Sequence, residues 1–234
     1  MAHASTSPCA AKARWSSCIP SLGRGAADFA ALAESLAAGR LSHRCHGPVG
    51  VAQSAGAAGR FTLHDYAEDV RAVIQALGGE PAHLVGHAYG NRVMRCLASD
   101  HPDLVRSVAF LACGGKVPPE DGARASLKRC FDVSLTDQDR LPSVQDAFFA
   151  SGNDASVWVN GWWPCAAAAQ ALATRRTPAE EWWHAGTAPV LVVQGMQDRL
   201  APPATPAPSR RTCGDPRHRG LKSRAPAMPC SGAA

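Results

Sequence analysis

The chain has 234 residues, 46% of them hydrophobic, which suits one soluble globular domain with a sizeable core. No run of about 18 apolar residues occurs and Met1–Pro20 lacks the order of a secretory signal, so we expect no membrane span and a cytoplasmic protein. The net charge of +5 is concentrated after Pro203, where a solvated tail explains it better than a nucleic-acid partner. The nine cysteines lack zinc-site and disulfide-framework spacing, and the sequence has no metal cluster or phosphate-cradling loop, so we expect no metal and no cofactor.

The beginning of the chain is only partly patterned. A helix is expected near 27–38. Arg40–Ala52 stands where a strand is needed, but few of its residues suit a buried strand, and its composition favours disorder. Residues 1–17 are equally unpatterned, so we place the folded domain at 18–203 and expect 1–17 and 204–234 to be disordered.

A helix over 62–77 is predicted by its start, its spacing and its end. Thr62 and Asp65 form a start that resembles a capping box. Gly78-Gly79 ends the segment. Apolar residues recur at helical spacing between them, at Leu63, Tyr66, Val70, Val73, Ile74 and Leu77.

The most informative segment follows this helix. A short buried strand around Leu84 runs into Gly86-His87-Ala88-Tyr89-Gly90, and a helix is expected over 91–98. The glycine spacing is that of the G-x-S-x-G nucleophile turn, with Ala88 where the serine belongs. Two glycines fit a sharp strand-to-helix turn, in which side chains would clash. The turn that presents a nucleophile is therefore predicted to be intact, but a methyl group cannot attack a carbonyl.

Two later apolar segments, 105–112 and 189–194, predict further buried strands of a parallel sheet. We interpret the long segment between them, 117–187, as a helical cap over the carboxyl ends of the strands, where ligands bind in such sheets. Aromatic side chains of this cap either line a ligand pocket or hold the cap onto the core; they are Trp158, Trp162, Trp163, Trp182 and Trp183.

These segments together resemble the α/β-hydrolase superfamily, in its capped branch of esterases, lipases, haloperoxidase-like enzymes and C–C hydrolases. The resemblance covers roughly 18–203, with a gap at 40–55. It implies an α/β fold, with a mainly parallel central sheet flanked by helices, a cap insertion and an incomplete C-terminal end. It also implies a small ester, lactone or related carbonyl compound as substrate or ligand. The segments that carry it are Ile19–Gly25, Phe61–Leu77, Ala82–Gly114 and Pro189–Pro203.

The resemblance also implies roles for four residues. Ala88 stands at the nucleophile position, and Asp198, in a loop after a strand, stands at the acid position. A turn-forming or helix-capping aspartate is the simpler interpretation of Asp198. The backbone amides of Tyr89 and Leu22 correspond to the oxyanion hole, which needs no particular side chain.

No convincing catalytic histidine follows Asp198. His218 is flanked by two arginines and has no strand signal before it, so we expect a tail residue. His87 lies inside the nucleophile turn and is not expected to be the base. Cys96 is too far along the helix to replace residue 88, and Cys113 is more simply a small buried residue than a reactive thiol.

Three interpretations remain open. The chain is a weak or inactive hydrolase, a ligand-binding protein with a hydrolase fold, or a truncated or frame-shifted hydrolase. The third follows from 1–17, 40–52 and 204–234, where expected strands and a histidine loop are missing. We place a hypothetical frame shift close to Ala204, and we expect the sheet to lack an edge strand and the last helix.

Overall fold

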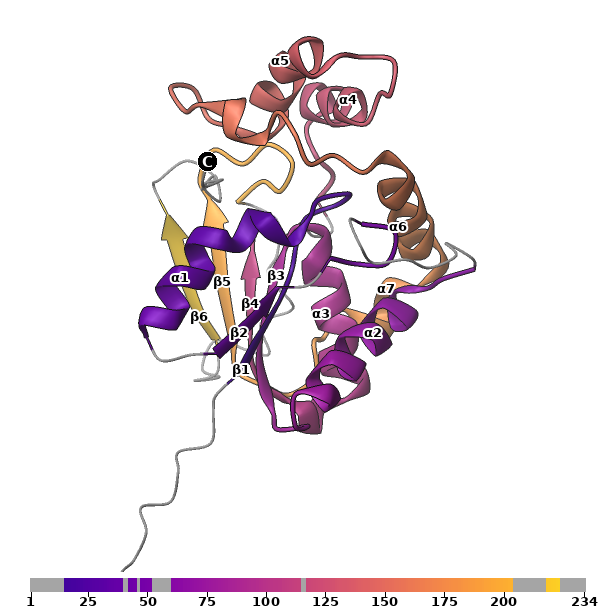
Figure 1. Ribbon diagram of the computed structural model, residues 1–234, viewed down its shortest axis with the longest axis vertical. Helices are drawn as coiled ribbons and strands as arrows, with labels where there is room; N and C mark the ends of the chain where they lie inside the picture. Colours follow the sequence, from indigo (N-terminus) through magenta and orange to yellow (C-terminus); the bar gives the residue numbers. More distant parts are fainter. Residues whose placement is uncertain are drawn as a thin grey trace, which may run out of the picture.

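A parallel sheet of six strands in the order β2-β1-β3-β4-β5-β6 forms the centre of the molecule (Figure 1). The structure is a computed structural model, and it describes residues 15–39, 42–45, 47–51, 60–114, 117–203 and 218–223. Every neighbouring pair of strands is parallel. The strands are β1 Trp15–Ile19, β2 Ser42–Cys45, β3 Ala82–His87, β4 Val105–Leu111, β5 Val190–Gly195 and β6 His218–Ser223.

Helices cover both faces of this sheet, as expected for an α/β fold. The α-helices are α1 Ala30–Ala38, α2 Leu63–Ala76, α3 Tyr89–Asp100, α4 Asp121–Cys130, α5 Asp137–Phe148, α6 Pro164–Arg176 and α7 Ala179–Trp182. Short 3₁₀ helices are η1 Ala26–Phe29, η2 Pro102–Leu104 and η3 Ala155–Trp158. Three sequence-based predictions are thereby confirmed: the helix after Thr62, the strand before Ala88 and the helix after it.

The two faces of the sheet bury different apolar clusters. Leu84 of β3 belongs to the large cluster formed with α2 and α3. Its neighbour Val85 belongs to a smaller cluster with Phe29, against which Leu32 of α1 packs. This alternation follows from the period of two in a strand, and it fixes the register of β3 between the two helical layers.

The start of α2 has the predicted capping box. The Thr62 hydroxyl accepts a hydrogen bond from the Asp65 amide, and the Asp65 carboxylate accepts one from the Thr62 amide at 2.7 Å. This reciprocal pair satisfies two amides that the first helical turn would otherwise leave unpaired. The Leu63 amide donates to the Thr177 hydroxyl at 2.8 Å, so the same turn is tied to the end of α6.

The segment between β4 and β5 is helical, but it has two parts. Helices α4 and α5 lie above the carboxyl ends of the strands, and we call 117–163 the cap (Figure 1). Helices α6 and α7 instead pack back against α2 and α3 beside the sheet. The tryptophans divide in the same way, since Trp158 belongs to the cap cluster and Trp182 and Trp183 belong to the main core.

Three expectations about the ends of the domain need correction. Strand β1 begins at Trp15, before the expected boundary at residue 18. Strand β2 forms within 40–52, where we expected disorder. Strand β6 forms within the expected tail and pairs with β5, so the described sheet has the edge strand that we expected to be missing.

The composition was misleading because β2 and β6 are the two edge strands of the sheet. An edge strand has one neighbour, and backbone hydrogen bonds hold it whatever its side chains are. The side chains of β2 are only partly buried, so no continuous apolar run is needed. The rest of the expected N-terminal tail, 204–217 with the hypothetical frame shift at Ala204, and 224–234 lie outside the described residues. Within the described part of the chain, no helix is long and apolar enough to cross a membrane.

Candidate active site

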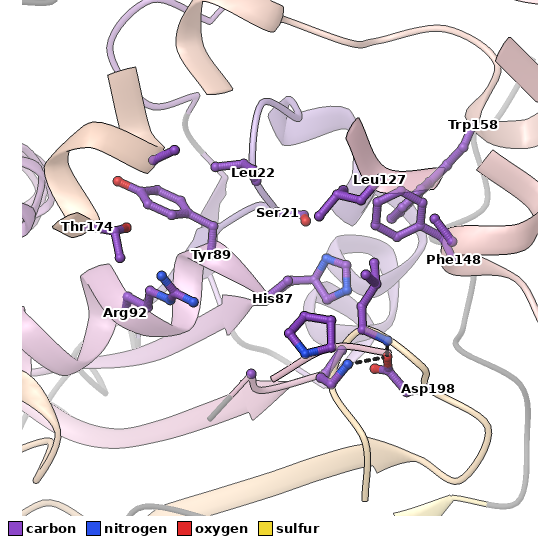
Figure 2. A pocket seen from close by; sticks show the side chains of 18 of the residues that line it. Ser21, Leu22, His87, Tyr89, Arg92, Leu127, Phe148, Trp158, Thr174 and Asp198 are labelled. Atoms are coloured by element: carbon purple, nitrogen blue, oxygen red, sulfur yellow. Dashed lines mark hydrogen bonds between the residues drawn. The ribbon is translucent and has the colours of Figure 1, made fainter. Parts of the chain in front are cut away.

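A cavity of about 360 Å³ lies between the carboxyl ends of the strands and the cap (Figure 2). The early loop contributes Ser21 and Leu22 to its lining, and the turn after β3 contributes 87–89. The cap contributes Phe148 and Trp158, and the loop after β5 contributes Asp198. Residues far apart in the sequence therefore meet here, at the carboxyl ends of the strands, where α/β proteins bind ligands.

The turn at Ala88 has an unusual backbone conformation. Ala88 has φ 49° and ψ −104°, and its amide donates to the Leu111 carbonyl at 3.0 Å. A methyl group added at Gly90 would come within 2.2 Å of the Ile19 carbonyl oxygen, and one at Gly86 would come within 2.7 Å of the Asn91 backbone. Both glycines are therefore required by close packing of the backbone, as the sequence predicted. The side chain at the tip of this turn is a methyl group.

Two backbone amides beside Ala88 are available to a ligand. Tyr89 is the first residue of α3, whose first-turn amides have no partner within the helix. Leu22 lines the same cavity from the loop after β1. Among the described residues, no acceptor is hydrogen bonded to either amide. The positive end of the α3 dipole adds to the attraction of this corner for partial negative charge.

Asp198 lines the cavity, but its carboxylate is hydrogen bonded within its own loop. Oδ1 accepts from the amides of Leu200 at 3.0 Å and Ala201 at 2.7 Å. Oδ2 accepts from the Gln194 side-chain amide at 3.1 Å. Burial raises the pKa of Asp198 above its ordinary value, although these hydrogen bonds oppose the shift. The geometry includes the turn-forming arrangement that the sequence left as the simpler interpretation.

No described histidine is hydrogen bonded to Asp198. His87 lines the cavity and contacts the Trp158 ring edge-on, with centroids 6.0 Å apart. Burial lowers the pKa of His87 to about 4, so its imidazole is neutral at pH 7 and a weak base. The backbone of His218 starts β6 and pairs with Val190, at the opposite end of the sheet from the cavity.

The two cysteines near the turn are buried and poorly suited to nucleophilic chemistry. Cys113 accepts a 3.7 Å hydrogen bond from the Arg95 guanidinium, yet burial still raises the pKa of its thiol. Burial also raises the pKa of Cys96 well above its ordinary value. A raised pKa keeps both sulfurs in the thiol form, which is a weak nucleophile. In the described part of the chain, no cluster of three metal-ligating side chains is present.

Sequence reasoning missed two arginines of this region. Arg24 is buried, forms a two-pronged ion pair with Asp28, and donates to the Asn160 carbonyl of the cap at 2.6 Å. Its guanidinium stacks against the rings of Trp158 and Trp162, at 4.5 and 4.6 Å from the centroids. Arg92 lines the cavity one turn after Ala88. The i, i+4 spacing of Arg24 and Asp28 was the only signal in the sequence, because Asn160 lies 136 residues away.

Comparisons with known proteins agree with this architecture. Residues 18–150 match the family described as alpha/beta hydrolase fold. Over 76 residues, 32% of this chain and 26% of the relative, the sequence is 37% identical to "Putative carbamate hydrolase RutD" of Caulobacter vibrioides. Over 178 residues, 67% of this chain and 37% of the relative, it is 28% identical to "Protein ABHD8" of Homo sapiens. The chain thus spans between a quarter and two fifths of the length of these curated relatives.

A solved structure extends the likeness to the whole fold. The enol-lactonase from Burkholderia xenovorans LB400 superposes with a TM-score of 0.70 at 19% identity, covering 92% of this chain and 84% of that chain. An identity this low supports a common fold, and function has to be argued from the site itself. The family match covers more than half of the sequence. The chain therefore belongs to the α/β-hydrolase fold family.

Proposed function

We propose that this chain binds a small carbonyl compound in the cavity below the cap and does not hydrolyse it through an acyl-enzyme. One observation carries the proposal: Ala88 occupies the tip of an intact nucleophile turn. A methyl group has no lone pair with which to attack, so the usual covalent intermediate cannot form. The cavity lies beside this methyl group, together with two backbone amides that have no acceptor among the described residues.

In this proposal the amides of Tyr89 and Leu22 receive the carbonyl oxygen of the ligand. They serve as an oxyanion hole, in which each donor is typically worth about 3 kcal/mol to a tetrahedral transition state. A bound ester, lactone or related carbonyl compound gains only the smaller ground-state part of that stabilisation. Asp198 stands at the acid position of the family, but its lone pairs satisfy its own loop, and neutral His87 is too weakly basic to activate water efficiently.

Activated esters test the catalytic half of this proposal. With p-nitrophenyl acetate the purified chain is expected to show no product burst, and a fluorophosphonate probe is expected not to label residue 88. Ala88→Ser restores the hydroxyl but not the histidine, so its turnover should stay at least a thousandfold below the roughly 10 per second of an ordinary enzyme. Ala112→Ser, which adds a hydroxyl elsewhere in the cavity, is the matched control. Turnover of Ala88→Ser within about tenfold of that ordinary value would contradict the proposal.

Tryptophan fluorescence tests the binding half, because Trp158 lines the cavity. The ketone 4-phenylbutan-2-one presents a carbonyl and an apolar ring but no bond to hydrolyse. We expect saturable quenching with the native chain and loss of this quenching in Ala171→Trp, which fills the cavity with an indole. Equal quenching in both proteins would show that the ketone binds elsewhere and would overturn the proposed function.

A frame-shifted hydrolase remains the second candidate. Two features of the sequence favour it. Asp198 stands at the acid position of the family, and no histidine occurs between Ser223 and Ala234. Reading the gene in its two other frames downstream of the Ala204 codon tests it. An apolar strand followed by a Gly-His loop within about 30 residues would support this candidate. Absence of such a segment in both frames would eliminate it.

A further inference from the structure

The cavity has one cationic wall. Arg92 of α3 and Thr174 of α6 lie on the same side of the cavity as Tyr89, and the aromatic side chains of the cap lie on the opposite side (Figure 2). Arg92 follows Tyr89 by three residues, so its Cα lies about 4.5 Å further along the helix axis. A ligand with its carbonyl oxygen on the Tyr89 amide therefore has the Arg92 side chain within reach of a short substituent.

Arg92 has no anionic partner among the described residues. Four other described arginines pair with carboxylates, whereas buried Arg95 donates to the Cys113 sulfur; the pairs are Arg24 with Asp28, Arg71 with Glu68, Arg140 with Asp137, and Arg199 with Glu120 and Asp146. Burial lowers the pKa of Arg92, which reflects the cost of removing its charge from water. A half-buried guanidinium that faces a cavity without a counter-ion is a donor group available to an anion.

A second polar group of the same wall also lacks a partner. The Tyr89 hydroxyl is buried and has no hydrogen-bond partner among the described residues. The Tyr89 side chain is 5% exposed and lies on the Arg92 side of the cavity. A phenol hydroxyl donates readily to a carboxylate oxygen. The Thr174 hydroxyl already donates to the Gln170 carbonyl at 3.1 Å, and Arg175 is exposed, so Arg92 and Tyr89 are the described donors of this wall that are removed from solvent.

From this wall we infer that the ligand of the cavity is a carboxylate-bearing carbonyl compound, with its carboxylate on Arg92. The planar guanidinium offers a fork of parallel N–H groups that matches the two oxygens of a carboxylate. The carbonyl group would lie at the Tyr89 and Leu22 amides, a few carbon atoms from the carboxylate. An apolar body would lie against Phe148 and Trp158. This inference rests on the proposed function, because it uses the same cavity and the same amides.

A matched pair of ketones separates the inference from the function on which it rests. The acid 5-oxo-5-phenylpentanoate has a carboxylate three methylene groups from its carbonyl, and its methyl ester has the same body without the charge. We expect isothermal titration calorimetry to show that the native chain binds the acid at least tenfold more tightly than the ester. Arg92→Met, which keeps a long side chain without charge, should weaken the acid at least tenfold and leave the ester within about twofold. Arg175→Met, at an exposed cation of the cavity lining, should change both affinities less than Arg92→Met changes that of the acid.

Each possible result decides between the two claims. Equal affinity of the native chain for acid and ester would overturn the carboxylate assignment and leave the carbonyl-binding function standing. If the native chain has the circular dichroism of a folded protein and binds neither compound, both the carboxylate assignment and the carbonyl-binding function are overturned. Inorganic phosphate that displaces the acid at comparable concentration would identify a general anion site and would also overturn the carboxylate assignment. Loss of ester binding in Arg92→Met would show that Arg92 supports the cavity structurally, which contradicts the inference.

Discussion

The turn around Ala88 and the loop around Asp198 face the same cavity, but different parts of them are preserved. The Ala88 turn has the sharp strand-to-helix backbone that the proposed function assigns to a nucleophile site, with a methyl group at its tip. The Asp198 loop has a carboxylate, and its oxygens accept hydrogen bonds from two amides of the same loop and from the Gln194 side chain of β5. The first region therefore has a distinctive backbone conformation with an unreactive side chain, and the second has a carboxylate whose oxygens are hydrogen bonded within its own surroundings.

Neither a sharp turn nor a carboxylate in a loop signals catalysis by itself. The turn persists because Gly86 and Gly90 allow β3, α3 and β1 to approach closely, which is a demand of core packing. Asp198 has a local reason to be retained, because without it two amides of its loop lose their acceptor. Activity would require a base that joins the two regions, and the described residues supply none bonded to Asp198.

The largest expected effect comes from the backbone of the turn. Gly90→Ala would place a methyl group 2.2 Å from the Ile19 carbonyl oxygen, and β1 and α3 would have to separate. We expect a loss of about 4 kcal/mol in the free energy of unfolding, or failure to fold. Gly79→Ala is the control, because no atom lies within 4 Å of the added methyl there; its expected cost comes from the positive φ of 70°, which Gly90 does not have. It should cost only about 1 kcal/mol in urea denaturation. Similar losses in both variants would show that close packing is not what preserves the turn.

The side chain of Asp198 should have the next largest effect. Asp198→Ala removes the acceptor of two amides and should cost about 2 kcal/mol, whereas Asp198→Asn keeps an acceptor oxygen and should cost less than about 1 kcal/mol. The raised pKa means that the folded state holds this proton to higher pH than the unfolded state does. The stability contributed by Asp198 is therefore present below pH 3.8 and declines as pH rises through the folded pKa. Urea denaturation at pH 4 and pH 7 should show Asp198→Asn gaining on the native chain at the higher pH; a gain at the lower pH would contradict the assigned role.

The parts of this comparison that the sequence could predict are those with local signals. The capping residues of α2 and the glycine spacing around Ala88 act within a few residues, so both were readable. Strand β2 was missed because a backbone pairing with β1 carries no side-chain signature. The contact of Arg24 with Asn160 was missed because it joins distant parts of the chain.

For a similar reason, the sequence predicted the position of Asp198 in a loop but not the hydrogen bonds of its side chain. The acid position followed from family resemblance and from a strand before the residue. The occupied lone pairs depend on the path of the loop through Ala201, which spacing alone does not specify. Nothing in the sequence distinguishes Arg92 from a helix surface residue, because α6, which lines the cavity beside it, is far away in the chain. The sequence therefore does not predict the role of a side chain when that role depends on an element that is distant in the chain.

The smallest expected effect addresses the strain at the tip of the turn. Ala88 has φ 49° and ψ −104°, a conformation that costs a residue with a side chain about 1–3 kcal/mol. Ala88→Gly relieves this strain and adds unfolded-state entropy worth about 0.5–1 kcal/mol, so we expect a net gain in stability of about 1 kcal/mol. Ala72→Gly, at an exposed position within α2, has no strain to relieve and should lose about 1 kcal/mol. Thermal and urea denaturation should therefore give opposite signs for one chemical change at two positions. If Ala88→Gly loses as much stability as Ala72→Gly, the backbone at residue 88 is not strained. Packing around the turn would then not be needed to hold Ala88 in this conformation.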